Sequence, residues 1–313
     1  MKKIVDVKQT VIITDENVFT HHQKKFKHYN TIVLKAGEEF KIQATVDNII
    51  EQLIQHKADR NTILIGIGGG MISDITGYTA SIYMRGIQFG FVPTTILSIV
   101  DASIAGKNGI NVGAFKNMVG TIQQPKFILH DLSFFNTLPK TEWQQGFAEI
   151  IKHACIKDAK MFKQLQLHSI KFYQSNKKEL AKLIEQNVLI KIIVVKNDEF
   201  EKGERRILNF GHTIGHALEM NYELLHGQAI AIGMTYASEI AENLLGFKQK
   251  NELISLLEQY ELPTFARYDK HKILHHISID KKKEKDFIHF ILLMKIGKAV
   301  ILPIKIKTLE KLI

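Results

Sequence analysis

Residues 63–71 read ILIGIGGGM, an apolar strand pattern that runs directly into Gly68, Gly69 and Gly70. A helical pattern opens just after it, near Ser73 and Asp74. Glycines let a backbone approach a pyrophosphate, and the N-terminus of a following helix supplies N–H donors and positive potential. The spacing differs from GxGxxG, so the stretch indicates either a dinucleotide site or a tight turn without a ligand.

Around this stretch, short apolar runs alternate with longer helical patterns from Val11 to Leu132. The runs are VIIT, TIVL, TILIGIG, FGFVPTT and FILHD, and the helical spacing is clearest from Gln43 to His56. Strands separated by helices of this length are typical of parallel βαβ units. The first half is therefore predicted to be a wound α/β domain.

The pattern changes after Pro139. Helical spacing covers Thr141–Leu165, Lys177–Glu199, His212–Leu245 and Gln249–Tyr260, and only FIHFILLM and AVILPI, joined by a turn, look like strands. A chain of 313 residues exceeds the usual size of a single core. We expect two domains, 1–138 of α/β type and 139–313 mostly helical.

The composition, with 45% hydrophobic and 24% charged residues, is that of a soluble globular protein. The net charge of +10 is spread along the chain without an aromatic-interleaved basic stripe, which disfavours nucleic acid and favours small phosphate-bearing ligands. A single cysteine, Cys155, excludes an intrachain disulfide. With no apolar signal core at the start and no membrane-spanning run, we expect a cytoplasmic protein.

Three histidines of the second half form a pattern that could bind a metal. His212 and His216 stand four residues apart in NFGHTIGHA, so they share one helix face, and His226 follows. A hydrolytic zinc helix would carry Glu where this chain has Thr213, which removes the general base of a peptidase. Together with Glu149, His212 and His226 would make a two-histidine, one-carboxylate set for a catalytic metal.

Each of the other polar groups can be interpreted either as part of a binding site or as an ordinary surface feature. Glu149 and Lys152 are three apart on one helix, where an exposed ion pair is the simple alternative to a site. The segment from Arg85 through Lys107 to Asn117 is rich in glycine and polar groups, typical of a loop around a polar ligand or of a solvated surface loop. Three polar residues precede the histidines: Lys191, Arg205 and Asn209. They either belong to a binding site or are ordinary polar residues on a helix surface.

The order and spacing of these motifs resemble the 3-dehydroquinate synthase family from about Val11 to the last strand. The matching elements are GIGGGMISDITG, YMRGIQFGFVPTTIL, VDASIAGKNGIN, KNMVG, QPKFILHDL, TLP, GFAEIIKH, DEFEKGERRILNFGHTIGHALE, LHGQAIAIGM and DKK.

The resemblance implies a Rossmann-like NAD-binding α/β domain and a C-terminal helical, metal-binding domain, with the active site in the cleft between them. It also implies a lyase of the shikimate pathway, which makes aromatic amino acids. The reaction converts 3-deoxy-D-arabino-heptulosonate 7-phosphate into 3-dehydroquinate and phosphate, through oxidation by NAD, phosphate elimination, reduction and aldol cyclisation. We expect a homodimer.

The same resemblance assigns residues. The metal ligands would be Glu149, His212 and His226, with Zn2+ as the usual ion and Co2+ as an alternative. The catalytic residues would be Lys107, Asn117, Lys152, Arg205 and His216. Further substrate contacts would be Asp101, Lys116, Lys191, Asn209, Lys281 and Lys282, with Arg85 reaching in from a neighbouring subunit. The NAD contacts would be Asp15, Asn17, Glu38, Lys41, Gly69, Gly70, Asp74, Thr94, Thr95, Lys107, Lys116, Phe134 and Thr137.

The chain departs from the family pattern at three loop positions. Ser73 and Ala105 replace glycines, and Asn108 stands where Thr or Val is common. The chain also begins about twenty residues later than typical members, so we expect a sheet edge that is exposed or covered differently.

Three other functions remain as alternatives. A sister cyclase, such as a deoxy-inosose or valiolone synthase, would share the metal and NAD residues but differ at the carboxylate-binding positions. A polyol dehydrogenase would release NADH as a product. A catalytically dead homologue that only binds partners would not need the metal.

Overall fold

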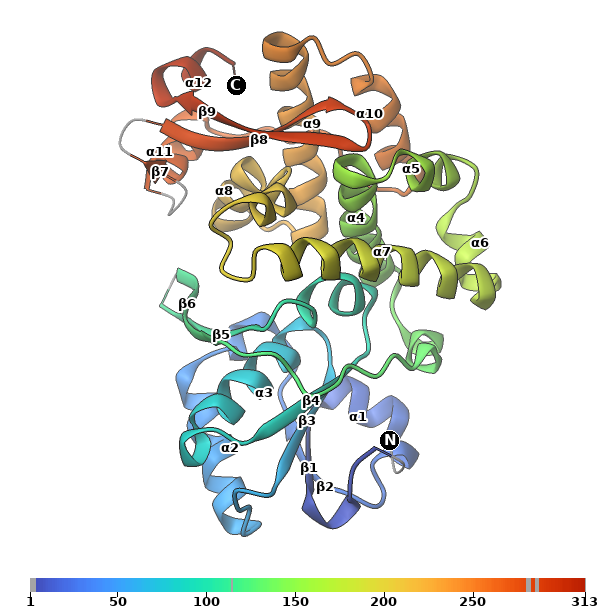
Figure 1. Cartoon of the computed structure of the whole chain (residues 1–313), viewed down its shortest axis with the longest axis vertical. Helices are drawn as coiled ribbons and strands as arrows, with labels where there is room; N and C mark the ends of the chain where they lie inside the picture. The colour runs from blue at the N-terminus through green and yellow to red at the C-terminus, as the bar shows by residue number, and fades with distance from the viewer. Residues whose placement is uncertain (1–3, 114, 280–282, 285–286, 313) are drawn as a thin grey trace. The chain divides into compact units, whose positions relative to one another are not determined.

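The structure is a computed structural model that describes residues 4–113, 115–279, 283–284 and 287–312 (Figure 1). The chain divides into two compact units, Met1–Glu142 and Trp143–Ile313, which are called unit 1 and unit 2 below. Each unit is described by itself.

Unit 1 is built on a four-stranded parallel sheet. Its strands are β1 (Thr10–Asp15), β2 (Asn30–Leu34), β3 (Ile63–Gly68) and β4 (Gln88–Pro93), in the order β2-β1-β3-β4. Every residue of β1 and β3 is buried. Strands buried on both faces read as continuous apolar runs, which is why ILIGIG carries no polar alternation.

Helices cover both faces of this sheet. They are α1 (Glu16–His22), α2 (Gln43–Gln55) and α3 (Gly70–Ile82). Val11 and Ile13 pack with residues of α2 and α3, while the intervening Ile12 packs on the opposite face with Phe134. The predicted α/β class of the first half is confirmed.

Two predicted features of unit 1 need correction. The segment 107–122, expected to be a loop, forms an antiparallel hairpin of β5 (Lys107–Val112) and β6 (Phe115–Ile122). The expected strand at 127–131 is instead an extended segment that meets β4 through a single bridge, Phe91 to Ile128. Its residues are as apolar as those of a buried strand, but only a few of its backbone groups form hydrogen bonds with β4.

Unit 2 is mostly helical, as predicted. Its helices are α4 (Lys140–Lys157), α5 (Ala159–Gln166), α6 (Ile170–Ser175), α7 (Lys177–Asn197), α8 (His212–Asn221), α9 (His226–Leu245), α10 (Lys250–Gln259), α11 (Lys270–Ile279) and α12 (Ile306–Leu312). The short β7 (Lys283–Glu284) pairs with β8 (Phe287–Lys295), which forms the expected hairpin with β9 (Lys298–Lys305). The core includes stacked aromatic rings of Trp143, Phe147 and Tyr260.

Two of the predicted long helices are broken. Asp158 separates α4 from α5, because its carboxylate accepts hydrogen bonds from the backbone N–H groups of Lys160 and Met161 and so starts a new helix. The predicted helix His212–Leu245 is interrupted between Asn221 and His226. The second break is the more important one, because it reverses the chain and returns His226 to His212.

Among the described residues, no helix is long and apolar enough to cross a membrane.

Candidate functional site

Several of the predicted NAD residues of unit 1 lie at one edge of the sheet. Asp15 ends β1, Gly69 follows β3 and Thr94 follows β4, and these strands are parallel neighbours. Thr95 lies beside Gly69, since a Cβ built on that glycine would be 3.4 Å from the Thr95 methyl group. Ligands of open parallel sheets bind at the carboxyl ends of the strands. The fold therefore brings the glycine stretch and its partners to the edge where a dinucleotide is expected.

Lys41 holds a second group of predicted contacts together. Its ammonium is buried and makes ion pairs with Asp74, at the start of α3, and with Glu38 at 3.5 Å. It also donates a hydrogen bond of 2.6 Å to Asn117 Oδ1 on β6. Burial alone would lower the pKa of Lys41, but the two carboxylates outweigh it and raise the pKa. Asn117, predicted as a catalytic residue, is thus fixed to a predicted cofactor residue.

Two further predicted NAD contacts lie on the face of the sheet covered by α1. The buried ring of Phe134 packs against His22, with centroids 4.7 Å apart, and His22 Nε2 lies 2.8 Å from the Thr137 hydroxyl. Asn17 is exposed on α1 itself. Sequence reasoning did not connect His22 with this group, because nothing local marks a histidine near the end of a helix as a partner of residues more than a hundred positions away.

The remaining predicted residues of unit 1 are spread more widely. Lys107 and Lys116 lie towards opposite ends of the hairpin, since Lys107 pairs with Ile122 at its base. Asp101 is partly buried in the helical turn after β4. Arg85 is exposed in a tight turn with φ of +67°. Lys107 and Lys116 are therefore separated by most of the length of the hairpin.

The three departures from the family pattern have structural explanations. Asn108 is buried and donates hydrogen bonds to the carbonyls of Gly106 and Gln123, so it ties the base of the hairpin together. Ser73 is buried against Ser98, at 3.3 Å between hydroxyls. Ala105 adopts φ of +143°, a conformation that favours glycine.

Unit 2 brings Glu149, His212 and His226 together from three helices. Glu149 lies on α4 with a fully buried carboxylate. Its Oε1 is 3.4 Å from His226 Nε2 and 3.7 Å from His212 Nε2. One donor atom from each residue lies within 4.8 Å of the others.

This spacing suits a divalent ion. Donors placed about 2.1 Å from a tetrahedral ion lie about 3.4 Å from one another. The two measured separations are close to that value. Two imidazoles and a carboxylate are also a common donor set for catalytic zinc, which leaves a position for substrate or water. The residues present therefore fit the metal that the resemblance implies.

The turn between α8 and α9 brings His226 close to His212. Gln228 accepts a hydrogen bond of 3.1 Å from the backbone N–H of Leu225, which stabilises the first turn of α9. The two helices then pack at very short range through glycines. A Cβ on Gly233 would be 2.0 Å from the carbonyl oxygen of Gly211. Gly211 itself has φ of +79°, which glycine adopts without strain.

Glu149 also makes an ion pair with Lys152, one turn along α4. The predicted shared face is correct, but both side chains are buried, so the exposed-pair alternative is wrong. A buried carboxylate needs opposite charge around it, and here Lys152 supplies part of it.

Glu219 is a neighbour that sequence reasoning missed. Its Oε2 is 3.3 Å from His226 Nδ1. Burial alone would lower the pKa of His226, but Glu149 and Glu219 outweigh it and raise the pKa to about 10. The two carboxylates thus place negative charge on both sides of His226, which suits a bound cation. The only sequence signal was the position of Glu219, one turn after His216 on the histidine helix.

The other described residues predicted in unit 2 lie on α7, on α8 and in the segment between them. The ring centroid of His216 is 5.0 Å from that of His212 and 6.3 Å from that of His226. Arg205 is buried and donates to the carbonyl of Glu199. Lys191 is buried on α7, and Asn209 donates a 2.6 Å hydrogen bond to Glu201. Lys281 and Lys282 lie outside the described residues.

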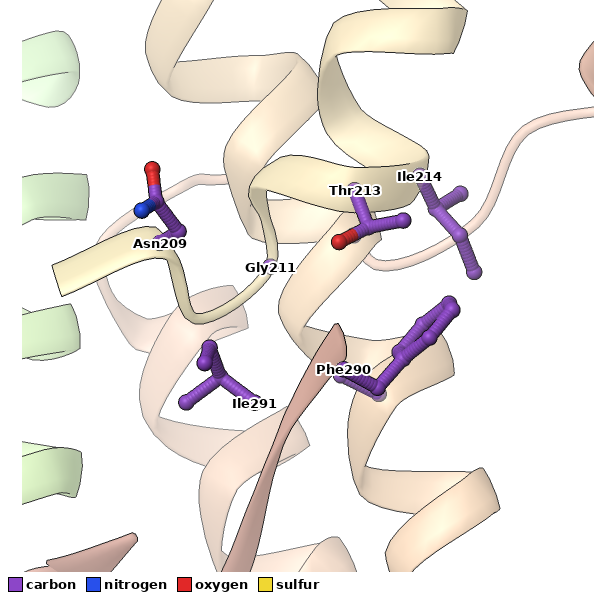
Figure 2. A pocket seen from close by; sticks show the side chains of 8 residues that line it. Asn209, Gly211, Thr213, Ile214, Phe290 and Ile291 are labelled. Atoms are coloured by element: carbon purple, nitrogen blue, oxygen red, sulfur yellow. The ribbon is translucent and has the colours of Figure 1, made fainter. Parts of the chain in front are cut away.

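A small pocket borders the start of α8 (Figure 2). Its lining is mostly apolar and consists of Asn209, Gly211, Thr213, Ile214, Gly233, Ala237, Phe290 and Ile291. Of these, Asn209 is a predicted substrate contact, and none is a predicted metal ligand. The pocket is therefore a packing gap beside the α8–α9 contact and not the site of the chemistry.

Comparison with known proteins agrees with the geometry. The N-terminal family model of 3-dehydroquinate synthase matches residues 31–145, and the C-terminal model matches residues 146–283. The 3-dehydroquinate synthase of Campylobacter concisus is 44% identical over 271 residues, which cover 85% of this chain and 77% of that protein. That of Nitratiruptor is 39% identical over 305 residues, covering 94% and 86%.

A solved structure of 2-deoxy-scyllo-inosose synthase complexed with carbaglucose-6-phosphate, NAD+ and Co2+ is also similar. It is 26% identical, with a TM-score of 0.84, and the match covers 99% of this chain and 92% of that one. Both family models, together spanning most of the sequence, identify the chain as a member of the 3-dehydroquinate synthase family.

Proposed function

We propose that the protein is a 3-dehydroquinate synthase, which converts 3-deoxy-D-arabino-heptulosonate 7-phosphate into 3-dehydroquinate and phosphate in the shikimate pathway. The observation that carries the proposal is the convergence of Glu149, His212 and His226 in a chain of this family, with Glu149 and His212 buried and His226 partly exposed. The identity of 44% to a named synthase supports the choice of substrate.

We propose NAD and a divalent metal, Zn2+ or Co2+, as cofactors. The related 2-deoxy-scyllo-inosose synthase was crystallised with NAD+ and Co2+. In this chain, the sheet edge with Gly69 and Gly70 supports the NAD, and the spacing of the three donors in unit 2 supports the metal.

When bound, the ion would polarise substrate hydroxyl groups, and NAD would accept a hydride and return it later in the same turnover. The residues of the chain would do the rest. Arg205 can grip the substrate carboxylate with two parallel hydrogen bonds, and Lys152 adds a point charge beside Glu149. Lys107 would neutralise charge on the phosphate, and Asn117 and His216 would donate hydrogen bonds to it, as its C–O bond breaks and the phosphate takes the proton of the neighbouring carbon.

Phosphate release from the proposed substrate by the purified protein tests this function. Release should require both catalytic NAD and a divalent ion, without net NADH at 340 nm, and Glu149→Gln should abolish it. Net NADH would instead identify a dehydrogenase. Absence of both release and bound metal would indicate a homologue without catalysis.

A sister cyclase is the second candidate, because the inosose synthase structure matches nearly the whole chain. That structure holds carbaglucose-6-phosphate, which has no carboxylate for Arg205 to bind. Release of phosphate from glucose 6-phosphate, and none from the sugar acid, would favour this candidate.

We further propose a homodimer in which Arg85 of one subunit contributes to substrate binding in the other. Its exposure in a tight turn supports this role. Sedimentation of the protein with its cofactors should give twice the mass of one chain, and a monomer that retains full activity would contradict the proposal.

A further inference from the structure

His226 has a carboxylate on each side of its ring. Nε2 faces Glu149 Oε1 at 3.4 Å, and Nδ1 faces Glu219 Oε2 at 3.3 Å. Glu149 comes from α4 and Glu219 from α8, while His226 is the first residue of α9. The ring is therefore held between two other helices.

His212, the other histidine of the set, has a comparable arrangement. Its Nδ1 donates a hydrogen bond of 3.1 Å to the carbonyl oxygen of Phe210, and its Nε2 faces Glu149. In both rings an oxygen acceptor next to Nδ1 favours a proton there. That tautomer leaves the lone pair of Nε2 directed at the position where the two rings and Glu149 converge.

We infer that Glu219 is a positioning residue that orients His226 and fixes its tautomer for metal binding. This inference rests on the metal-dependent function proposed above. The hydrogen bond from Nδ1 to a carboxylate also makes Nε2 a more basic donor, and such outer partners commonly contribute 10- to 100-fold to metal affinity.

The position of Glu219 suits this role. Its side chain is 14% exposed, so little water competes for the carboxylate. It lies near the end of α8, just before the turn that leads to His226. His226 follows as the first residue of α9, so its contact with Glu219 holds its ring against the preceding helix.

A rival reading is that Glu219 is itself a ligand. His216, Glu219 and His226 also place one donor atom each within 4.8 Å of one another. The two readings share His226 but differ in what they predict for the number of ions. An orienting Glu219 gives one ion per chain, whereas a ligand Glu219 gives a second ion or a different coordination of the first.

The test is Co2+ binding to the metal-depleted full chain, followed by its visible absorption and by competition with a chromophoric chelator. The variants are Glu219→Gln, which keeps a hydrogen-bond acceptor without the charge, and Glu219→Ala, which removes both. Glu223→Gln is the matched control, because Glu223 is an exposed acid in the turn between the same helices. Unfolding midpoints of the metal-free variants show whether the fold is kept.

We expect one ion per chain throughout, with Co2+ affinity reduced about 10- to 100-fold in Glu219→Ala, less in Glu219→Gln and not at all in Glu223→Gln. The Co2+ spectrum of Glu219→Gln should keep the band positions of the unchanged protein. Wild-type affinity in Glu219→Ala, or a loss of one of two ions, would overturn the inference.

Failure of the inference can be told apart from failure of the proposed function. Phosphate release by the unchanged protein together with unaltered Co2+ affinity in the variants refutes only the role of Glu219. Reduced affinity in the variants, with no phosphate release by the unchanged protein, refutes only the substrate.

Discussion

At Ala105 the backbone has φ of +143°. In this conformation the Cβ of alanine clashes with the backbone, whereas glycine has no Cβ and adopts it freely. Backbone strain of this kind costs about 1–3 kcal/mol, and glycine loses about 0.5–1 kcal/mol in entropy on folding. We expect Ala105→Gly to raise the thermal unfolding midpoint by a few degrees in circular dichroism. The same exchange at Ala241, inside α9, should lower it, and a lower midpoint for both would show that residue 105 is unstrained.

Arg205 gives a second prediction for a single side chain. It is buried, and its guanidinium matches a carboxylate in a way that an ammonium does not. We expect Arg205→Lys to raise the KM for the sugar acid phosphate about 10- to 100-fold, which corresponds to a charged hydrogen bond of about 1.5–3 kcal/mol. Phosphate release measures this, with Arg206→Lys as the control; an unchanged KM would place the substrate carboxylate elsewhere.

Single residues also show the limit of sequence reasoning about the site. The spacing of His212 and His216 predicts a shared helix face, but it does not say which histidine joins Glu149. The residues alone allowed Glu149, His212 and His226 as one possible metal set, and the family resemblance then selected it. Neither the spacing nor the resemblance identified Glu219. A carboxylate that contacts a metal-binding histidine, and not the metal itself, follows no fixed spacing in the sequence.

Between elements, α8 and α9 pack in close contact through glycines. A Cβ on Gly233 would be 2.0 Å from Gly211 O and 2.8 Å from Gly215 N, both backbone atoms that have no rotamer to change. Gly233→Ala should therefore push the helices apart, lower the free energy of unfolding by about 1–3 kcal/mol and weaken Co2+ binding at least tenfold. Chemical denaturation and Co2+ titration test both effects.

The control for this substitution is Asn243→Ala, at an exposed position of α9. It should change the free energy of unfolding by less than about 0.5 kcal/mol and leave Co2+ affinity as it is. Unchanged Co2+ affinity in Gly233→Ala would mean that the helix spacing does not set the separation of His212 from His226.

Helices and strands whose apolar residues recur at regular spacing were predictable from the sequence. Elements whose ends or strand pairing depend on distant residues were not. The strand Ile63–Gly68 and the helix Gln43–Gln55 follow local apolar patterns. The break between α8 and α9 was missed because apolar residues continue in helical register across it. The hairpin at residues 107–122 was missed because β6 is almost entirely exposed and shows no alternation of polar and apolar side chains.

For the whole molecule, two compact units imply two separable responses to ligands. Hydrogen exchange followed by mass spectrometry should show NAD slowing exchange in β3 and α3, and Zn2+ slowing it in α4, α8 and α9. A ligand at 100 times its Kd stabilises the state that binds it by about 2.7 kcal/mol, which corresponds to about 100-fold slower exchange where opening is cooperative. Protection by NAD confined to unit 2 would contradict the assignment of the cofactor to unit 1.

The three donors of unit 2 come from α4, α8 and α9, and Glu149 is completely enclosed. An ion held by them would act as a cross-link between segments far apart in the sequence. An ion at this place would bind only the folded unit, so its binding free energy would add to the stability of unit 2. Removal of the metal with a chelator would then loosen the contact between these segments, and the metal-free protein would be unfolded and digested by a protease more readily than the loaded one.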